Sequence, residues 1–161
     1  MRKLFGALAL VGATLVAVGV AFAAPAPTTF VAVLNAADEV PQCAPVGDDA
    51  RGLAIFHVVD QEAGTVRFKL ISNNVPGTTV AAHIHIGPAG VAGPVVQGLF
   101  LGPPTTGNGI LAEGMFTNPG LVAAMQADPQ AYYVNVHSAP DCGPGAIRGQ
   151  LGTHGPSGTT E

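Results

Sequence analysis

Three histidines are the residues of this sequence best placed to carry chemistry. His83 and His85 alternate with isoleucines in an apolar run, and residues two apart in a strand share one face, so both imidazoles point the same way. His137 ends a second alternating run, at 133–137, on the face opposite its valines. If these two strands pair, three imidazoles converge on one side of a sheet, and such a set suits copper or zinc.

The same trio also fits a structural role that needs no metal. A histidine near the end of a strand can donate a hydrogen bond to backbone carbonyls in a neighbouring turn, and a Gly/Pro-rich segment follows His85 directly. Both roles stay open at this point. His57 is expected to face solvent or to lie half-buried, and His154 falls in a Gly/Ser/Thr tail, so neither joins the trio.

Other catalytic constellations are poorly supported. Ser72, Ser138 and Ser157 have no nucleophile-elbow context, and no glycine pattern follows a strand and opens a helix, as phosphate or dinucleotide binding requires. The adjacent acidic pairs at 38–39 and 48–49 lie in turn-rich stretches, where they are expected to cap turns or face solvent. The sequence therefore assigns no catalytic residue and favours a protein that is not an enzyme.

The composition excludes one large class of function. The chain has 161 residues, enough for one domain, with a formal charge of −4 and only 10% charged residues, against about 25% in an average soluble protein. Because Lys and Arg number only 6, the chain lacks the basic surface that nucleic-acid binding requires. So few charges also disfavour a helical bundle, whose exposed faces carry Glu and Lys.

Short alternating or β-branched runs, separated by Gly, Pro and Asn, predict a chain of strands. The expected strands lie near 30–34, 52–59, 65–71, 80–86, 94–101, 110–116, 132–137 and 146–151. One helix is expected over Pro119–Ala127, with Asn118 as its N-cap and proline at its first position. This pattern predicts an all-β, single-domain antiparallel sandwich or barrel with one short helix.

The N-terminus predicts export. A positive start at Arg2 and Lys3 precedes an apolar run at 4–21 and the small-residue motif Ala21-Phe22-Ala23, which together are typical of a secretory signal peptide. The alternative is an uncleaved membrane anchor, because the run approaches the length of a membrane span. The predicted organisation is a signal peptide at 1–23, a spacer at 24–29, one domain at 30–152 and a flexible tail at 153–161.

After cleavage the chain would carry no membrane span and would be secreted, periplasmic or held at the cell surface. In such a location the two cysteines, Cys43 and Cys142, are expected to form a disulfide. They lie 99 residues apart, and the chain-entropy model assigns about 4–5 kcal/mol to a loop of roughly that length. The alternative is a pair of thiolates that binds a soft metal.

Five blocks along the chain resemble the CHRD domain, a module named after chordin and widespread in exported bacterial proteins. The blocks are Leu34–Pro41, Gly52–Phe56, Ala82–Gly90, Tyr133–His137 and Gly145–Leu151. The resemblance covers about 30–151 and implies a compact β-sandwich of immunoglobulin-like build with no agreed catalytic activity. It implies an extracytoplasmic binding or structural module, whose partner would be an unidentified protein or surface ligand.

One departure from the CHRD pattern concerns the last block. CHRD domains usually carry an acidic residue before the closing Ile-Arg-Gly, whereas this chain has Ala146. Arg148 therefore needs another partner, and we expect Glu39, from the first block, to meet it in a buried pair. The alternative is that the two side chains occupy separate, solvent-exposed positions.

A weaker likeness points to copper/zinc superoxide dismutase, also a β-sandwich. There, His83, His85 and His137 would correspond to three copper ligands, with Arg148 as the neighbouring cation. The zinc half is missing, because the loop at 87–93 is short and apolar. The likeness implies a mononuclear copper or zinc site, redox-active if the metal is copper, as the alternative to a metal-free binding module.

Overall fold

The computed structural model describes residues 25–44, 46–106 and 108–153. The predicted signal peptide at 1–23, His154 and nearly all of the predicted tail lie outside these residues. The described strands are β1 (Thr29–Asn35), β2 (Arg51–Asp60), β3 (Thr65–Asn73), β4 (Thr78–Ile86), β5 (Val95–Thr105), β6 (Gly109–Thr117), β7 (Tyr132–Ala139), β8 (Cys142–Gln150) and β9 (Gly152–Thr153). A helix, α1 (Pro119–Ala127), and a 3₁₀ turn (Pro129–Ala131) stand between β6 and β7.

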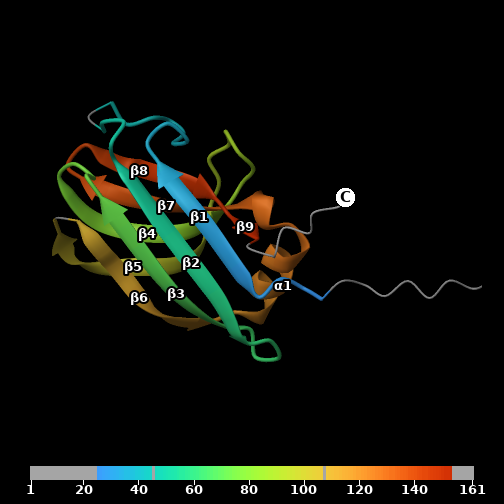
Figure 1. The fold of residues 1–161 in the computed structure, drawn as a ribbon. Helices are drawn as coiled ribbons and strands as arrows, with labels where there is room; N and C mark the ends of the chain where they lie inside the picture. Colours follow the sequence, from blue (N-terminus) through green and yellow to red (C-terminus); the bar gives the residue numbers. More distant parts are fainter. Residues whose placement is uncertain (1–24, 45, 107, 154–161) are drawn as a thin grey trace, which may run out of the picture.

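The strands form one antiparallel sheet in the order β5-β4-β7-β8-β1-β2-β3-β6, with β9 paired to β1 (Figure 1). The two end strands, β5 and β6, contact each other, so the sheet is nearly closed. A single residue pair, Asn35 with Arg148, joins β1 to β8. Gly149 permits this close approach, because a side chain there would collide with the backbone of Val33. The predicted all-β antiparallel fold is confirmed.

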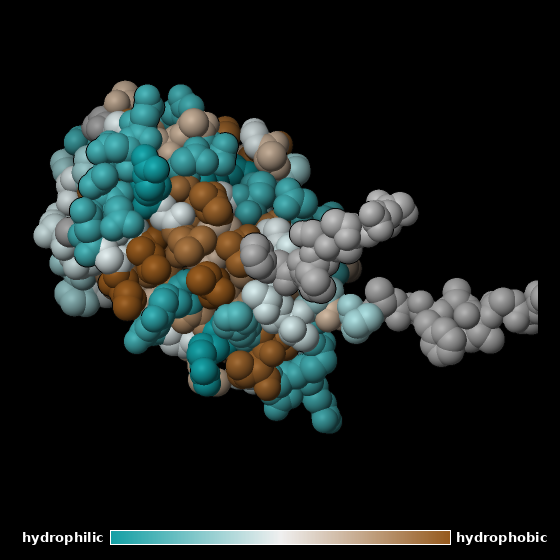
Figure 2. All heavy atoms as spheres, viewed as in Figure 1, coloured by the Kyte–Doolittle hydropathy of each residue, from teal (hydrophilic) through white to brown (hydrophobic). Residues whose placement is uncertain are grey.

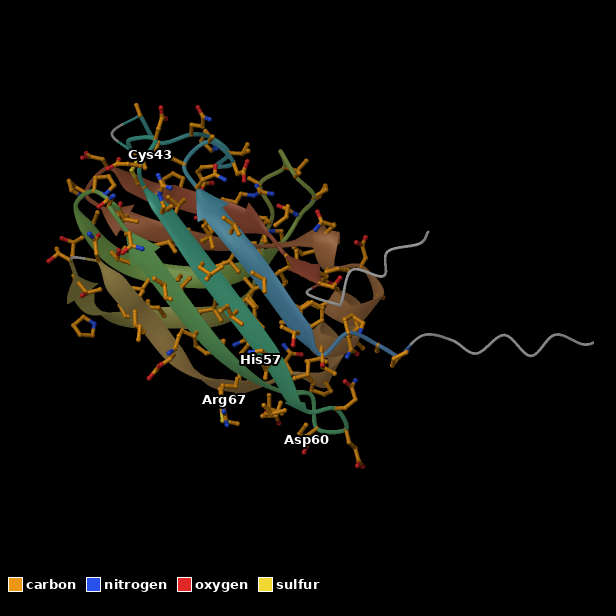
Figure 3. The ribbon with its side chains drawn as sticks, in the orientation of Figure 1. Cys43, His57, Asp60 and Arg67 are labelled. Carbon is orange, nitrogen blue, oxygen red and sulfur yellow. A yellow bond between two sulfur atoms is a disulfide. The ribbon has the colours of Figure 1, made fainter. Side chains whose placement is uncertain are left out.

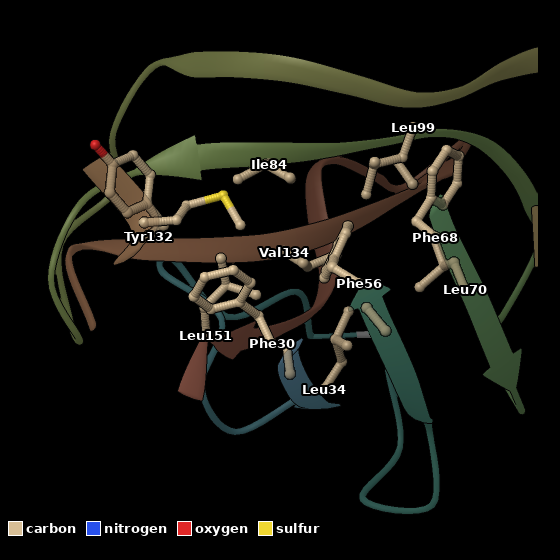
Figure 4. Packing of buried hydrophobic residues seen from close by; sticks show 14 of the residues in the cluster. Phe30, Leu34, Phe56, Phe68, Leu70, Ile84, Leu99, Tyr132, Val134 and Leu151 are labelled. Carbon is tan, nitrogen blue, oxygen red and sulfur yellow. The ribbon is translucent and has the colours of Figure 1, made fainter. Parts of the chain in front are cut away.

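The core lies between the two halves of this sheet. Strand residues alternate between buried and exposed in β1 and β3, as expected where one face packs on a core and the other faces water. Phe30, Phe56, Phe68, Ile84 and Val134 point into the core from five different strands (Figure 4). Large apolar side chains from distant parts of the chain therefore hold the halves together.

Helix α1 packs against one side of the core, and it begins and ends where the sequence predicts. The Asn118 side chain accepts a hydrogen bond from the backbone N–H of Leu121 at 3.1 Å, which satisfies a donor of the first turn. Leu121, Val122 and Met125 are buried in the core. Among the described residues, no helix is long and apolar enough to cross a membrane.

Two strand boundaries differ by four residues from those that the sequence predicts, whereas the other differences are of one or two residues. Strand β5 runs on through Pro103 and Pro104 to Thr105, which is possible because an end strand leaves N–H positions unpaired where proline can sit. Strand β8 begins at Cys142 rather than at 146, because β7 turns directly into it at 139–142. Both extensions are rich in glycine and proline, so the sequence pattern did not predict them as strand.

One region departs from the usual alternation. Strand β7 is buried on both of its faces along almost its whole length. Its inward residues join the core, whereas Tyr133, Asn135 and His137 lie on the outward side beneath two irregular segments, 36–50 (described except for residue 45) and 87–94. This second layer of burial, outside the sheet, positions the candidate site.

Candidate metal centre

The three histidines lie together on the outward side of β4, β7 and β8, which we call the covered face because segments 36–50 and 87–94 lie over it. Strands β4 and β7 pair, with His83 opposite Asn135, His85 opposite Tyr133 and His137 opposite Ala81. The strand pairing that brings the three histidines together is therefore present. The histidines come from two blocks more than 50 positions apart in sequence.

The three imidazoles are close enough to share one ion. One ring nitrogen of His83, one of His85 and one of His137 all lie within 4.8 Å of one another. The ring centroids are 5.0 Å apart for His83 and His137, 5.7 Å for His83 and His85, and 5.8 Å for His85 and His137. No other group of three or more candidate ligands meets this criterion among the described residues.

Backbone carbonyls orient two of the rings. The Nδ1 of His85 lies 2.8 Å from the carbonyl oxygen of Gly93, and the Nδ1 of His137 lies 2.8 Å from that of Gly143. A carbonyl can only accept, so each Nδ1 carries the proton and each Nε2 keeps its lone pair. The Nε2 of His85 is buried and has no hydrogen-bond partner. Such outer partners commonly fix the tautomer of metal-binding histidines.

His83 differs from the other two because no backbone carbonyl holds it. Its Nδ1 lies 3.1 Å from the Nε2 of His137, and since that nitrogen is the acceptor, His83 donates. His83 is half-buried, whereas the other two rings are buried. Gly98 stands opposite His83 on β5, and a side chain there would meet nothing within 4 Å. The side of the centre next to β5 is therefore the open one.

The environment keeps all three rings neutral. Burial, together with the nearby rings of His137 and His85, lowers the pKa of His83 to about 4. Burial also lowers the pKa of His85, as do the charges of His137 and Arg148, against the opposing hydrogen bond to Gly93. Burial lowers the pKa of His137 despite its bond to Gly143. At neutral pH each ring offers a lone pair, the form in which imidazole binds metals.

Arg148 holds the segment at 87–94 onto the sheet. Its guanidinium donates to the carbonyl oxygens of Val91 at 2.9 Å and Pro88 at 2.8 Å, and to Oε1 of Gln150 at 2.9 Å. It also lies 3.5 Å from the centre of the Tyr133 ring, which stacks on His85 at 4.8 Å. Arg148 is only 1% exposed. Arg148 is therefore a cation near the trio, as the dismutase likeness implies, with the ring of Tyr133 between it and His85.

The expected pair of Glu39 with Arg148 is not formed. Both side chains are buried, so the solvent-exposed alternative is also wrong, but neither an ion pair nor a hydrogen bond joins them. Oε1 of Glu39 accepts instead from the backbone of Val40 at 2.9 Å and from Asn135 at 3.4 Å. Burial raises the pKa of Glu39, against the opposing hydrogen bonds from Val40 and Asn135 and the charge of Arg148, which acts without direct contact. Arg148 donates to loop carbonyls instead of the expected carboxylate, and residue types in the sequence do not reveal such carbonyl partners.

Cys43 and Cys142 form the predicted disulfide, which joins the segment at 36–50 to the start of β8. Figure 3 shows Cys43 at the end of the molecule opposite His57. Cys142 directly precedes Gly143, whose carbonyl orients His137. The thiolate alternative is wrong, and the disulfide is part of the framework around the centre. His57 is exposed on β2 and hydrogen-bonded to Thr29 at 3.1 Å, apart from the trio.

The comparisons with known proteins decide the family. The model of the CHRD domain matches residues 30–151, three quarters of the chain. This chain belongs to the CHRD family. No curated protein and no solved structure matched it.

The CHRD domain contains every residue of the candidate centre and both cysteines. Family and disulfide together favour an extracytoplasmic location, because disulfides persist in oxidising compartments. The expected bond from a histidine to a carbonyl of the Gly/Pro-rich segment is present between His85 and Gly93. Sequence reasoning did not name that residue, and it missed the carbonyl of Gly143 and the stacking of Tyr133 between His85 and Arg148. Only the aromatic residue could have been found, since Tyr133 shares a strand face with His137.

Proposed function

We propose that this CHRD domain is an exported binding module whose ligand is a copper or zinc ion held by His83, His85 and His137. The observation that carries the proposal is the convergence of three neutral imidazoles, one of which presents a buried Nε2 with no partner. An unpaired buried nitrogen costs free energy. A metal ion at the centre of the trio would supply the missing partner.

The ligand set indicates which ions fit. Three nitrogens without thiolate or carboxylate suit Zn²⁺ with a fourth, exogenous ligand, and they suit Cu²⁺, which binds more tightly in the usual affinity order. A fourth ligand would arrive from the open side, past Gly98. To bind, His83 must release its hydrogen bond to His137 and turn a lone pair toward the ion. This assigns no catalytic activity to the protein.

A metal titration tests this function. Untagged protein, freed of metal with a chelator, is titrated with Cu²⁺ and Zn²⁺ at pH 7.5 and followed by calorimetry, and the copper form is examined for imidazole nitrogen coupling by electron paramagnetic resonance. His83→Ala and His137→Ala should each weaken binding by about 100-fold or more. His57→Ala is the matched control, because His57 is exposed on another strand, and it should bind as the wild type does.

The result that would contradict the proposal is equal, weak binding by the wild type and all three variants. Circular dichroism and thermal unfolding must show that the His83 and His137 variants are folded, since both histidines also support the covered face. In that outcome the histidines only organise the turns around them. The domain would then remain a binding or structural module for an extracytoplasmic protein or surface ligand.

Export is the second part of the proposal. The apolar run at 4–21 and the motif before Ala24 support cleavage after residue 23. Mass spectrometry of protein recovered from outside the cytoplasm should give an N-terminus at Ala24. Intact residues 1–23 in a membrane fraction would show instead that the segment is retained as an anchor.

A further inference from the structure

The outward side of β1, β2, β3 and β6 is an uncovered surface, which we call the open face. Figure 2 shows apolar side chains gathered at its centre. Across four neighbouring strands, Val33 pairs with Leu53, Leu53 with Ile71, and Ile71 with Ile110. Val33 is 66% exposed and Ile110 is 58% exposed. Contiguous apolar side chains exposed to solvent in this way commonly mark a binding site for a ligand or a partner.

The exposed cations of the described residues are all on this face. They are Arg51 on β2 and Arg67 and Lys69 on β3, and each occupies an outward position on its strand. The remaining described cation, Arg148, is buried under the other face. The chain has a net charge of −4. The exposed positive charges of the described residues are nevertheless all on the open face.

Two of these cations line a groove. The groove measures about 560 Å³ and crosses β2, β3 and β6, within the size range of sites for small organic ligands. Its walls are two cross-strand rows, His57–Arg67–Met115 and Ile55–Lys69–Glu113. Phe68 and Gly114 lie between these rows and also line the groove, although the ring of Phe68 packs in the core.

The charges in the groove do not cancel. Lys69 is paired with Glu113 at 3.4 Å, and His57 is bonded to Thr29. Arg67 makes no ion pair and no side-chain hydrogen bond with any described residue. One permanent, exposed guanidinium therefore stands between an imidazole and the apolar side chain of Met115. A guanidinium favours carboxylates, which it can hold with two parallel hydrogen bonds.

We propose that this groove binds an organic monoanion, a carboxylate carried on an apolar chain, with the carboxylate at Arg67 and the chain along Ile55 and Met115. A flat anionic membrane fits less well, because acidic residues flank the face at both ends. Asp60 ends β2, near Arg67 in Figure 3, Glu62 follows in the β2–β3 turn, and 48–49 is acidic at the other end of β2. A ligand that ends within the groove meets the acidic residues of one end only, whereas a flat membrane would meet those of both ends.

The test uses the full mature protein, with decanoate as the probe below its micelle concentration, followed by calorimetry or by NMR. Decan-1-ol keeps the chain and removes the charge, whereas acetate keeps the charge and removes the chain. Decanoate should bind at least about ten-fold more tightly than either compound, a difference that one charge-assisted hydrogen bond supplies. Shifted NMR signals should map to β2, β3 and β6.

Variants distinguish the groove from the rest of the face. Arg67→Gln should weaken decanoate binding by about ten-fold or more and leave decan-1-ol unaffected. Arg51→Gln is the matched control, because it removes a cation of the same face outside the groove, and it should change nothing. Met115→Glu places a negative charge beside Arg67 at an exposed position and should abolish binding of decanoate without unfolding the protein.

Three results would overturn the proposal. They are equal binding of decanoate and decan-1-ol, an equal loss in the Arg51 and Arg67 variants, and binding to phosphatidylglycerol vesicles without binding of free decanoate. The last would make the open face a membrane surface instead. None of these depends on whether the three histidines bind a metal.

Discussion

The covered face and the open face are outward sides of the same sheet, yet they give the same residue types opposite properties. Arg148 on the covered face is enclosed and donates three hydrogen bonds, two of them to carbonyls of segment 87–94, whereas Arg67 on the open face is exposed and unpaired. His137 is buried and oriented by a carbonyl, whereas His57 is exposed. The two segments 36–50 and 87–94, rather than the strands themselves, therefore determine which outward polar residues are buried.

The largest expected difference between the faces is in their arginines. Arg148→Gln should lower the free energy of unfolding by about 3–5 kcal/mol, because it leaves buried carbonyls without a donor and removes a stacked cation. Arg67→Gln should change it by less than about 0.5 kcal/mol, as exposed substitutions usually do. Urea denaturation followed by circular dichroism measures both. A loss below about 1 kcal/mol for Arg148→Gln would mean that it does not hold segment 87–94.

The next largest effect is expected from the disulfide, which anchors one of the two covering segments. Replacing both Cys43 and Cys142 by alanine should lower the free energy of unfolding by about 2–4 kcal/mol. Reduction of the wild type with dithiothreitol should give a similar loss. In NMR spectra the shifts should concentrate on the covered face, around Gly143 and His137. Equal shifts on β2 and β3 would show that the crosslink does not act on the covered face in particular.

The smallest of the three effects is a pH dependence of the metal-free protein. His83 has a native pKa of about 4 against 6.5 for the ordinary ring, so between these values the unfolded chain binds more protons. Its contribution to stability is therefore present above about pH 6.5 and is lost as the pH falls toward about 4. Solvent screening reduces the effect, because this ring is half-exposed.

Melting temperatures at pH 7.5, 6 and 5, in the presence of a chelator, measure this slope. His83→Gln should flatten the slope. Glu39 acts in the opposite direction, because burial raises its pKa, so Glu39→Gln should steepen the loss at low pH. A slope that is the same in the wild type and in His83→Gln would show that His83 does not cause it.

Local pattern was enough to predict the strands, the helix and the direction of the histidines. Alternation in β4 and β7 correctly placed His83, His85 and His137 on the sides away from the core. The capping of α1 by Asn118 was visible because an N-cap and its helix are contiguous in sequence. The ends of β5 and β8 were not visible, because proline and glycine are atypical of strands and only the position in the sheet allows them there.

The partner of Arg148 marks the limit of such prediction. A chain with few charges suggested a carboxylate, and Glu39 was the candidate, but the guanidinium found backbone carbonyls and the ring of Tyr133. Every residue carries a carbonyl, so a bond to one leaves no trace in residue type. For the histidines, the Gly/Pro-rich segment after His85 predicted a carbonyl partner in general terms, but not that Gly93 and Gly143 supply it.

The sequence by itself determined the antiparallel all-β class, the family, the disulfide and the face on which each histidine lies, because these follow from periodicity, block order and a single cysteine pair. Only the tertiary structure decided that segments 36–50 and 87–94 cover one outward face and leave the other bare. That choice depends on contacts such as those between Arg148 and the 87–94 carbonyls, which form between residues roughly sixty positions apart. Burial on the covered face lowers the pKa values of its histidines. On the open face the cations stay exposed to solvent.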